Sequence, residues 1–189
     1  MCGRYYIDDE TSREIRKILE QLDAKYENNN RKTGEIFPTD TAPILAAFGK
    51  NIEPEVSVWG FPNYYKKGVL INSRAETVLD KKTFRESVLS RRCIIPSSGF
   101  YEWDSSKNKF YFKRDNTEIL YMAGVYNFFN EECRFVILTT QSNQSMNGIH
   151  DRMPVVLDQE EVEQWILDNN SISRLLNQVP PALNRISRV

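Results

Sequence analysis

Apolar residues recur every three or four positions after the first ten residues of the chain: Ile15, Ile18, Leu19 and Leu22. This spacing is typical of one face of an α-helix, and Thr11 and Glu14 have the spacing of a capping box just ahead of it. We therefore predict a helix over residues 11–24. The polar, turn-rich stretch over residues 25–41 predicts a long loop, a kind of segment that often carries function.

Short segments rich in β-branched and aromatic residues follow and alternate with turns, as strands do. They span residues 44–48, 56–59, 69–77, 93–95, 110–113, 119–126 and 135–140. Asp115 and Asn116 predict the turn of one hairpin. Helical patterns recur over residues 83–90, 160–167 and 171–176. Thr83 and Glu86 repeat the capping-box spacing at the start of the first of these.

Strands outnumber helices in this pattern, and the helices do not alternate with them regularly. The order favours an α+β fold with a mainly antiparallel sheet or barrel and flanking helices over a doubly wound parallel sheet. The chain has 189 residues, of which 40% are hydrophobic and 27% are charged. This composition excludes a disordered or fibrous chain and predicts a single domain over residues 1–189.

Charge and cysteine content restrict the binding partners and the cellular compartment that we expect. With 25 Lys and Arg against 26 Asp and Glu, the formal net charge is −1, so a polyanion would need a local basic patch. No apolar run approaches the roughly 20 residues of a membrane span, and no basic and apolar leader opens the chain. Three widely spaced cysteines make a poor disulfide framework. We expect a cytoplasmic monomer that does not contact membranes.

The chain opens with Met1-Cys2-Gly3-Arg4. Removal of Met1 before a small residue would leave Cys2 with a free α-amine and a thiol. Their ordinary pKa values, roughly 7.7 to 8.0 and about 8.5, keep a fraction of each group nucleophilic near neutral pH. A buried cysteine with no chemical role is the alternative, and the dipeptide alone favours it.

Three later segments change that weighting. A strand over residues 70–77 would place Asn72, Arg74 and Glu76 on one face, which is either a solvated surface or a polar wall that meets a polar partner. Glu102 stands among aromatic residues, where burial would raise its pKa toward the range of proton transfer, unless it lies at the surface. His150, the only histidine, can exchange protons near neutral pH, although a lone histidine is more often structural.

No metal or cofactor site is predicted. The four side chains that could serve as zinc ligands are Cys2, Cys93, Cys133 and His150. They lack the close-spaced pairs that are typical of zinc sites.

Five segments together resemble the SRAP family, the SOS response-associated peptidases, which process abasic sites. They are residues 1–4 (MCGR), 71–77 (INSRAET), 92–96 (RCIIP), 99–103 (GFYEW) and 149–154 (IHDRMP). Each is weak alone, but their order along nearly the whole chain is specific. The resemblance implies a distorted antiparallel barrel with a basic groove for single-stranded DNA that leads to Cys2. It further implies that Cys2 links covalently to the aldehyde of an abasic site as a thiazolidine, without a cofactor.

The resemblance also implies roles for individual residues. His150 would open the sugar ring, Glu102 would shuttle protons around the Cys2 amine, and Asn72 would position the sugar. Arg4, Arg74 and Arg152 would hold phosphates. Residues predicted to stack on flanking bases are Pro38, Trp59, Tyr64 and Tyr65. Some relatives have tryptophans where this chain has the two tyrosines.

Other functions fit parts of the same pattern. Strand cleavage by β-elimination from an imine on Cys2, and self-processing that exposes Cys2, are further activities of the same site. An N-terminal-nucleophile amidohydrolase of the glutaminase type also begins Met-Cys-Gly, but such a domain usually feeds a synthase domain, which 189 residues do not accommodate. A non-catalytic reader of single-stranded DNA is the third candidate.

Overall fold

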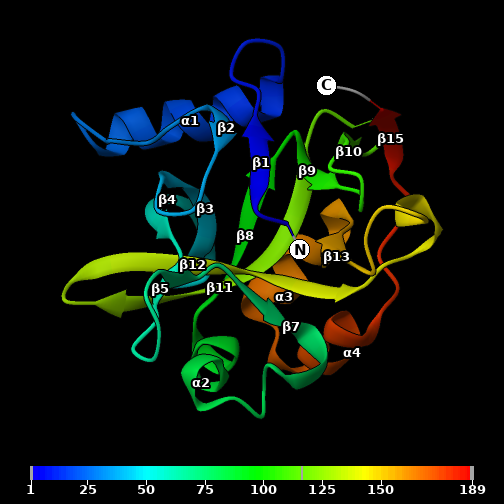
Figure 1. Ribbon diagram of the computed structural model, residues 1–189. Coiled ribbons are helices and arrows are strands. Elements are labelled where there is room, and N and C mark those ends of the chain that lie inside the picture. Colours follow the sequence, from blue (N-terminus) through cyan, green and yellow to red (C-terminus); the bar gives the residue numbers. More distant parts are fainter. Residues whose placement is uncertain (1, 116, 188–189) are drawn as a thin grey trace.

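A closed barrel of five strands forms the centre of the computed structural model, which describes residues 2–115 and 117–187 (Figure 1). In spatial order the strands are β12 (Glu132–Gln141), β4 (Asn51–Trp59), β3 (Thr41–Phe48), β8 (Arg92–Ser97) and β11 (Leu120–Phe129), which pairs again with β12. Three short strands extend it: β7 (Asn72–Arg74) and β13 (Arg152–Pro154) on β12, and β14 (Val156–Leu157) on β11. Among the described pairings, β12 is parallel to β4 and β7, and the others are antiparallel.

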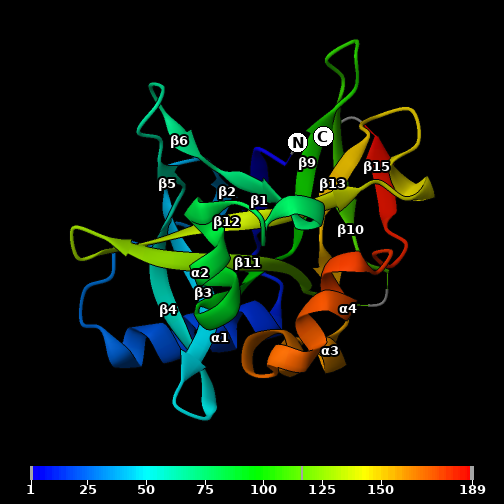
Figure 2. The same ribbon diagram turned by 90° about the horizontal axis from the view of Figure 1, so that it is seen from below.

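A second antiparallel sheet lies across the barrel. Its order is β15 (Asn184–Ser187), β10 (Lys109–Lys113), β9 (Gly99–Trp103), β1 (Arg4–Ile7) and β2 (Gly34–Ile36). β5 (Phe61–Pro62) and β6 (Val69–Leu70) form a separate hairpin. In Figure 2 this hairpin and the turn between β9 and β10 rise on the same side of the molecule as the N-terminus.

Helices cover the barrel from outside. They are α1 (Arg13–Lys25), α2 (Lys82–Ser90), α3 (Gln159–Leu167) and α4 (Ile172–Asn177), with the 3-10 turns η1 (Ala75–Thr77), η2 (Gln144–Met146) and η3 (Asn169–Ser171). α1 buries Ile15, Leu19 and Leu22, as its apolar spacing predicts. Within the described ranges, no helix is long and apolar enough to cross a membrane.

Two buried clusters hold these layers together. One fills the barrel and the space under α1 and β1, where Trp59 lies between Tyr5 and Phe135 with ring centroids 5.2 and 6.3 Å away. The other joins the outer face of β8 and β11 to α2, α3 and α4 around Phe84 and Trp165. Burial of each large side chain contributes roughly 2 to 3 kcal/mol, so both clusters stabilise the fold strongly.

The predicted α+β fold with a barrel is confirmed. Of the four predicted helices, the last three begin and end within one residue of α2, α3 and α4. Both capping boxes are wrong. Thr11 binds Asp8 through its amide (2.8 Å) and its hydroxyl, so the N-cap is the next residue, Ser12, whose Oγ accepts from the Ile15 amide, and the helix begins at Arg13. α2 begins after Lys81, which provides no side-chain cap.

Three other expectations differ from the structure. The loop predicted over residues 25–41 contains β2, which pairs with β1. The strand predicted over residues 69–77 breaks between β6 and β7 and ends in η1. β10 and β11, which flank the predicted hairpin turn, pair with other strands, because both lie inside larger sheets. Asn116 of that turn lies outside the described residues.

Candidate active site

Cys2 lies immediately before β1 and is fully buried. Its thiol donates a long hydrogen bond to the carbonyl of Arg4, with Sγ and oxygen 3.7 Å apart, and its own carbonyl accepts from Asn72 Nδ2 at 2.9 Å. Burial raises the pKa of the Cys2 thiol far above its usual value, and the charge of Glu102 raises it further. The thiol is therefore neutral at physiological pH and needs a base before it can react.

Glu102 is the buried carboxyl group that β9 brings to Cys2. Arg4 stands opposite Tyr101 in the antiparallel pairing of β1 and β9, so the next residue of β9 continues toward the start of the chain. Glu102 is 3% exposed. Burial raises its pKa above the usual value, and the charge of His150 opposes this effect. A carboxyl group in this state is suited to accept and return protons near neutral pH.

Asn72 reaches Cys2 from β7. The parallel pairing of β7 with β12 places Asn72 opposite Ile137 and turns its amide toward the cysteine carbonyl. Asn72 Oδ1 is buried and has no hydrogen-bond partner within the described part of the chain. An unpaired buried oxygen is costly, so this atom is available to a donor that enters the site.

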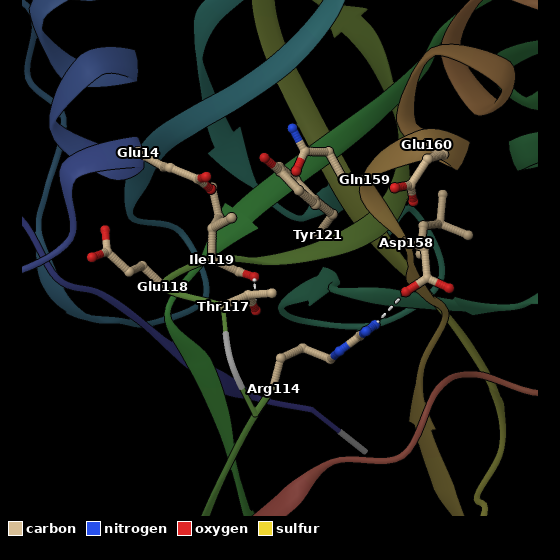
Figure 3. Close-up of a pocket in the computed structure, with 10 residues that line it drawn as sticks. Glu14, Arg114, Thr117, Glu118, Ile119, Tyr121, Asp158, Gln159 and Glu160 are labelled. Carbon is tan, nitrogen blue, oxygen red and sulfur yellow. Dashed lines mark hydrogen bonds and ion pairs between the residues drawn. The ribbon is translucent and has the colours of Figure 1, made fainter.

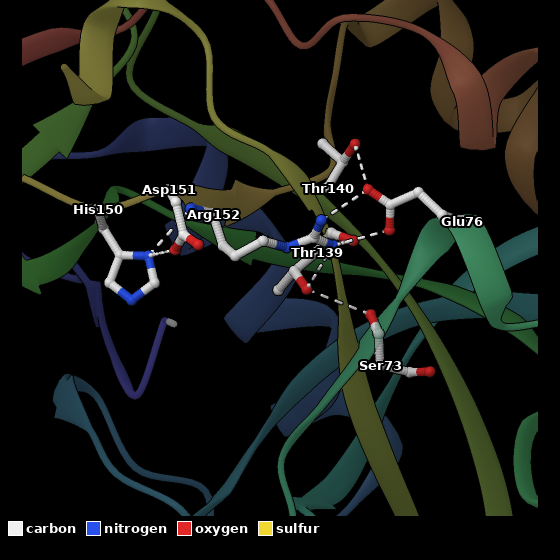
Figure 4. A network of polar contacts seen from close by, with 7 residues as sticks. All are labelled: Ser73, Glu76, Thr139, Thr140, His150, Asp151 and Arg152. Atoms are coloured by element: carbon white, nitrogen blue, oxygen red, sulfur yellow. Dashed lines mark hydrogen bonds and ion pairs between the residues drawn. The ribbon is translucent and has the colours of Figure 1, made fainter.

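His150 lies on the segment that leads into β13, next to Asp151 and Arg152 (Figure 4). Its Nδ1 accepts from the Arg152 amide at 2.9 Å and lies 3.0 Å from Asp151 Oδ1. The side chain of His150 is 27% exposed, so the ring is reachable from outside. Its influence on Glu102 shows that the two side chains share one electrostatic site.

Arg152 is placed differently from the prediction. Its guanidinium is 8% exposed and binds Glu76 through two bonds of 2.6 and 2.9 Å and the Thr139 carbonyl through one of 2.6 Å. A DNA phosphate would have to displace Glu76 to reach it. Within the described structure Arg152 lies in the wall of the site, and its phosphate contact stays a prediction that requires Glu76 to give way.

Arg4 lies at the edge of the site in a mixed aromatic and ionic setting. Its guanidinium stacks on Phe37 and Trp103, 4.2 and 5.1 Å from the ring centroids, and donates to Glu35 at 3.0 Å. Lys109 binds the other oxygen of Glu35 at 2.6 Å and holds the pKa of that carboxyl below its usual range. Sequence reasoning missed the contact between Glu35 and Lys109, because these residues come from the distant strands β2 and β10 and share no motif.

The residues predicted to stack on bases fall into two groups. Tyr64 and Tyr65, in the β5–β6 turn, are 80% and 93% exposed, and Pro38 is half-buried in a turn before β3. Trp59 is fully buried and donates to the Ile71 carbonyl at 3.0 Å. Its predicted stacking role is wrong, because a base could reach the ring only by opening the barrel core.

Arg74 is the exposed cation of this region. It ends β7, two residues after Asn72, and no hydrogen bond or ion pair to another described residue holds its guanidinium. Ser73 and Ala75 on either side are buried, so the predicted alternation of faces is confirmed from Asn72 to Glu76. On the polar side of this segment, Asn72 contacts Cys2 and Arg74 lies in solvent at the edge of the site.

A separate cavity of about 400 Å³ lies between α1, the start of β11 and the start of α3 (Figure 3). Arg114 and Asp158 face each other across it with an ion pair of 2.7 Å. Its other carboxylates include Glu118 and Glu160, which are exposed. It shares no residue with the Cys2 site, and its charged groups are solvated rather than buried.

Comparisons with known proteins agree on one family. The family model described as SOS response associated peptidase (SRAP) matches residues 1–188. Abasic site processing protein YoaM of Bacillus subtilis is 37% identical over 90% of this chain and 81% of its own length. Abasic site processing protein YedK of Escherichia coli is 25% identical over 88% and 79%. A crystal structure of a Bacteroides thetaiotaomicron protein has a TM-score of 0.79 at 23% identity and covers 98% of this chain and 91% of its own.

Proposed function

The chain belongs to the SOS response-associated peptidase (SRAP) family, and we propose that it processes abasic sites in DNA through a covalent bond to Cys2. The names of its curated relatives support the substrate. The observation that carries the covalent step is the arrangement at Cys2, whose thiol is buried in the field of Glu102 and whose carbonyl is held by Asn72. Cys133 also lies near a carboxylate, Glu55, but among the described cysteines the bond from an asparagine side chain to the cysteine carbonyl is found at Cys2 alone.

The proposed reaction begins when removal of Met1 frees the Cys2 α-amine. The amine attacks the C1′ aldehyde of the ring-opened sugar, and loss of one water gives an imine. Sγ then adds to C1′ while the thiol proton passes to the imine nitrogen, which closes a five-membered thiazolidine. Because the thiol belongs to the residue that forms the imine, closure is intramolecular and benefits from a high effective molarity. One water is the only by-product, and no oxidant or cofactor is consumed.

Three side chains assist these steps. Glu102, with its raised pKa, takes the proton of the attacking amine and later of the thiol, and returns a proton to the departing hydroxyl. Asn72 Oδ1, unpaired and buried, accepts a hydrogen bond from the sugar. His150 donates a proton to the sugar oxygen as the ring opens. Removal of Met1 is the only peptide-bond cleavage that the proposal requires.

Strand cleavage competes with ring closure at the imine. Loss of a proton from C2′ of the imine expels the 3′ phosphate by β-elimination, whereas attack of Sγ removes the imine. Closure is favoured because Sγ belongs to the residue whose nitrogen is already bonded to C1′. We therefore propose the crosslink as the main product and the lyase reaction as the minor one.

We propose that a monomer binds the DNA as a single strand across the face that carries the N-terminus. Tyr64 and Tyr65 provide exposed rings on which unpaired bases stack, and Arg74 provides a cation for a phosphate. The β5–β6 hairpin that carries the tyrosines rises on the same side as the N-terminus in Figure 2. Duplex DNA keeps its bases paired and offers no faces to such rings.

Intact-mass spectrometry of the purified protein tests the proposal directly. The protein is incubated with a single-stranded oligonucleotide that contains one abasic site, without borohydride. We expect a mass that lacks Met1 and that increases by the oligonucleotide less one water. Cys2→Ala should give no adduct, and Cys2→Ser, which keeps the amine but loses Sγ, should cut the strand more than the wild type does.

Two outcomes would overturn the proposal. A processed protein that binds the oligonucleotide without a mass increase would be a passive reader of single strands. A processed protein without adduct that releases ammonia from glutamine would be an amidohydrolase.

A further inference from the structure

Three side chains, those of Arg152, Glu76 and Thr139, link the segment that carries Asn72 to the segment that leads from His150 into β13, and Figure 4 shows all three. Arg152, at the start of β13, donates two hydrogen bonds to Glu76 on η1, at 2.6 and 2.9 Å. It also donates to the carbonyl and the hydroxyl of Thr139 on β12, at 2.6 and 3.3 Å. The Thr139 hydroxyl donates to the carbonyl of Ser73, which follows Asn72 on β7.

The backbone of Arg152 continues this link to the histidine. Its amide donates to His150 Nδ1 at 2.9 Å. A nitrogen that accepts a hydrogen bond carries no proton, so the proton of the neutral ring is on Nε2. In Figure 4 Nε2 points away from Asp151 and Arg152. The ring is thus held with its donor atom turned outward.

The geometry points to Glu76 as a positioning residue that acts through Arg152 on His150. This inference rests on the proposed function, since it concerns the orientation of that site. Glu76 lies on the same segment as Asn72, so its two bonds to Arg152 set the position of the histidine relative to the asparagine. Glu76 contacts neither Cys2 nor His150 in the described structure, which distinguishes its role from that of a catalytic residue.

Two observations support a fixed geometry. The bonds from Arg152 hold the pKa of Glu76 below its usual range, so the carboxylate is charged and keeps both bonds at neutral pH. Asp151 also lies 3.0 Å from Nδ1, but its side chain is 89% exposed and weakly held. A carboxylate pairs only with a protonated Nδ1, so in the neutral ring the Arg152 amide is the partner of Nδ1, and Glu76 anchors the residue that supplies it.

The single histidine of the chain gives this inference a direct spectroscopic test. The protein, prepared without a histidine tag and labelled with ¹⁵N at histidine, is studied by long-range ¹H–¹⁵N NMR at about pH 8.5, above the usual pKa of roughly 6.5. We expect an unprotonated Nδ1 and a protonated Nε2 in the wild type. Glu76→Ala should move both nitrogen shifts toward the average of the two tautomers, and Glu76→Gln, which keeps one acceptor, should lie between.

Kinetics provide the second readout. Under single turnover with excess protein, Glu76→Ala should lower the maximum rate of adduct formation by about tenfold to a hundredfold and leave the half-saturating protein concentration unchanged. If Glu76 acts through His150, the same substitution made in His150→Ala should cause no further loss of rate. A residue that only stabilises the fold would lower the two rates by the same factor.

Glu132→Ala is the matched control. Glu132 also pairs with an arginine, Arg134, and stands on the same strand as Thr139, but at its opposite end. It should leave both the histidine spectrum and the rate unchanged. Unaltered ¹⁵N shifts in Glu76→Ala would overturn the inference, as would a loss of rate that persists in full without His150.

Failure of the proposed function is a different result. In that case the wild-type protein forms no adduct, while the NMR comparison still decides whether Glu76 orients His150. The two conclusions therefore stand or fall on separate measurements.

Discussion

Two arginines in the described part of the chain are buried, and they lie in different regions of the molecule. Arg92, 4% exposed, sits between the barrel and the helices that cover it, and donates to the carbonyls of Val88, Leu89 and Ile166 at 2.8, 3.1 and 3.2 Å. Arg152, 8% exposed, sits at the Cys2 site and binds a carboxylate.

The partners of the two guanidiniums differ in kind. Those of Arg92 are carbonyls at the C-terminal ends of α2 and α3, where the helix dipoles favour a cation and the last carbonyls lack helical partners. Those of Arg152 are the carboxylate of Glu76, on the turn η1 that follows Asn72 and β7, and the carbonyl of Thr139 on β12. An arginine side chain therefore joins helices to the barrel at Arg92, and at Arg152 it holds the segments that carry the reactive groups.

The largest expected effect is on stability at Arg92. Arg92→Ala removes the donor to carbonyls at the ends of two helices and leaves them buried, so we expect the free energy of unfolding to fall by about 3 kcal/mol or more. Urea denaturation measures this loss. Arg85→Ala, which removes an exposed arginine of α2, should change the free energy of unfolding by less than about 0.5 kcal/mol. Adduct formation per folded molecule should stay normal, and a large chemical defect in Arg92→Ala would break the contrast between the regions.

The next effect is on chemistry alone. His150→Ala should slow adduct formation by about 10²-fold, because a positioned acid–base group contributes at least that factor. The histidine is partly exposed, so the melting temperature should change little. Quenched time courses with abasic and intact oligonucleotides separate rate from affinity, and binding of the intact strand should be unaltered. A wild-type time course would remove His150 from the mechanism.

A smaller effect is expected on the pH dependence of stability at Glu102, the buried carboxyl group of the site. Burial raises the pKa of Glu102. The contribution of this carboxyl group to the free energy of unfolding is therefore fully present below the unfolded pKa of about 4.3 and is lost as pH rises through the folded pKa. Glu102→Gln removes this loss. The free energy of unfolding of this variant, measured by urea denaturation at several pH values, should exceed that of the wild type by a margin that widens by at most about 1.4 kcal/mol per pH unit as pH rises toward the folded pKa, while its adduct forms more slowly. A margin independent of pH would show that Glu102 does not titrate in the folded protein.

The fold could be predicted from the sequence because helical spacing and strand composition are local patterns. Helical spacing places Ile15, Leu19 and Leu22 on the buried face of α1, and strand composition locates the barrel. What these patterns missed are strands of two to five residues such as β2 and β9, which form only because a neighbouring strand pairs with them. Such short segments carry no period of their own.

The candidate site was predictable as a set of residues but not as a geometry. The motifs named Cys2, Asn72 and Glu102, which the fold does bring together. The same motifs did not distinguish exposed from buried members, so Trp59 was assigned a base contact although it is fully buried, and Arg152 a phosphate contact although Glu76 already binds its guanidinium. Burial depends on contacts between distant strands, which no single motif contains.

A third arginine, Arg74, is exposed and sharpens the comparison with the two buried ones. If it contacts one phosphate of a single strand, Arg74→Ala should weaken binding of every oligonucleotide alike by about fivefold and reduce the slope of log affinity against log salt by about 0.7. Fluorescence anisotropy at several salt concentrations measures both. Lys17→Ala, on the exposed side of α1, should change neither. An unaltered slope in Arg74→Ala would place the phosphate contact elsewhere, and Lys66 and Lys67, beside the exposed Tyr65, would be the next cations to test.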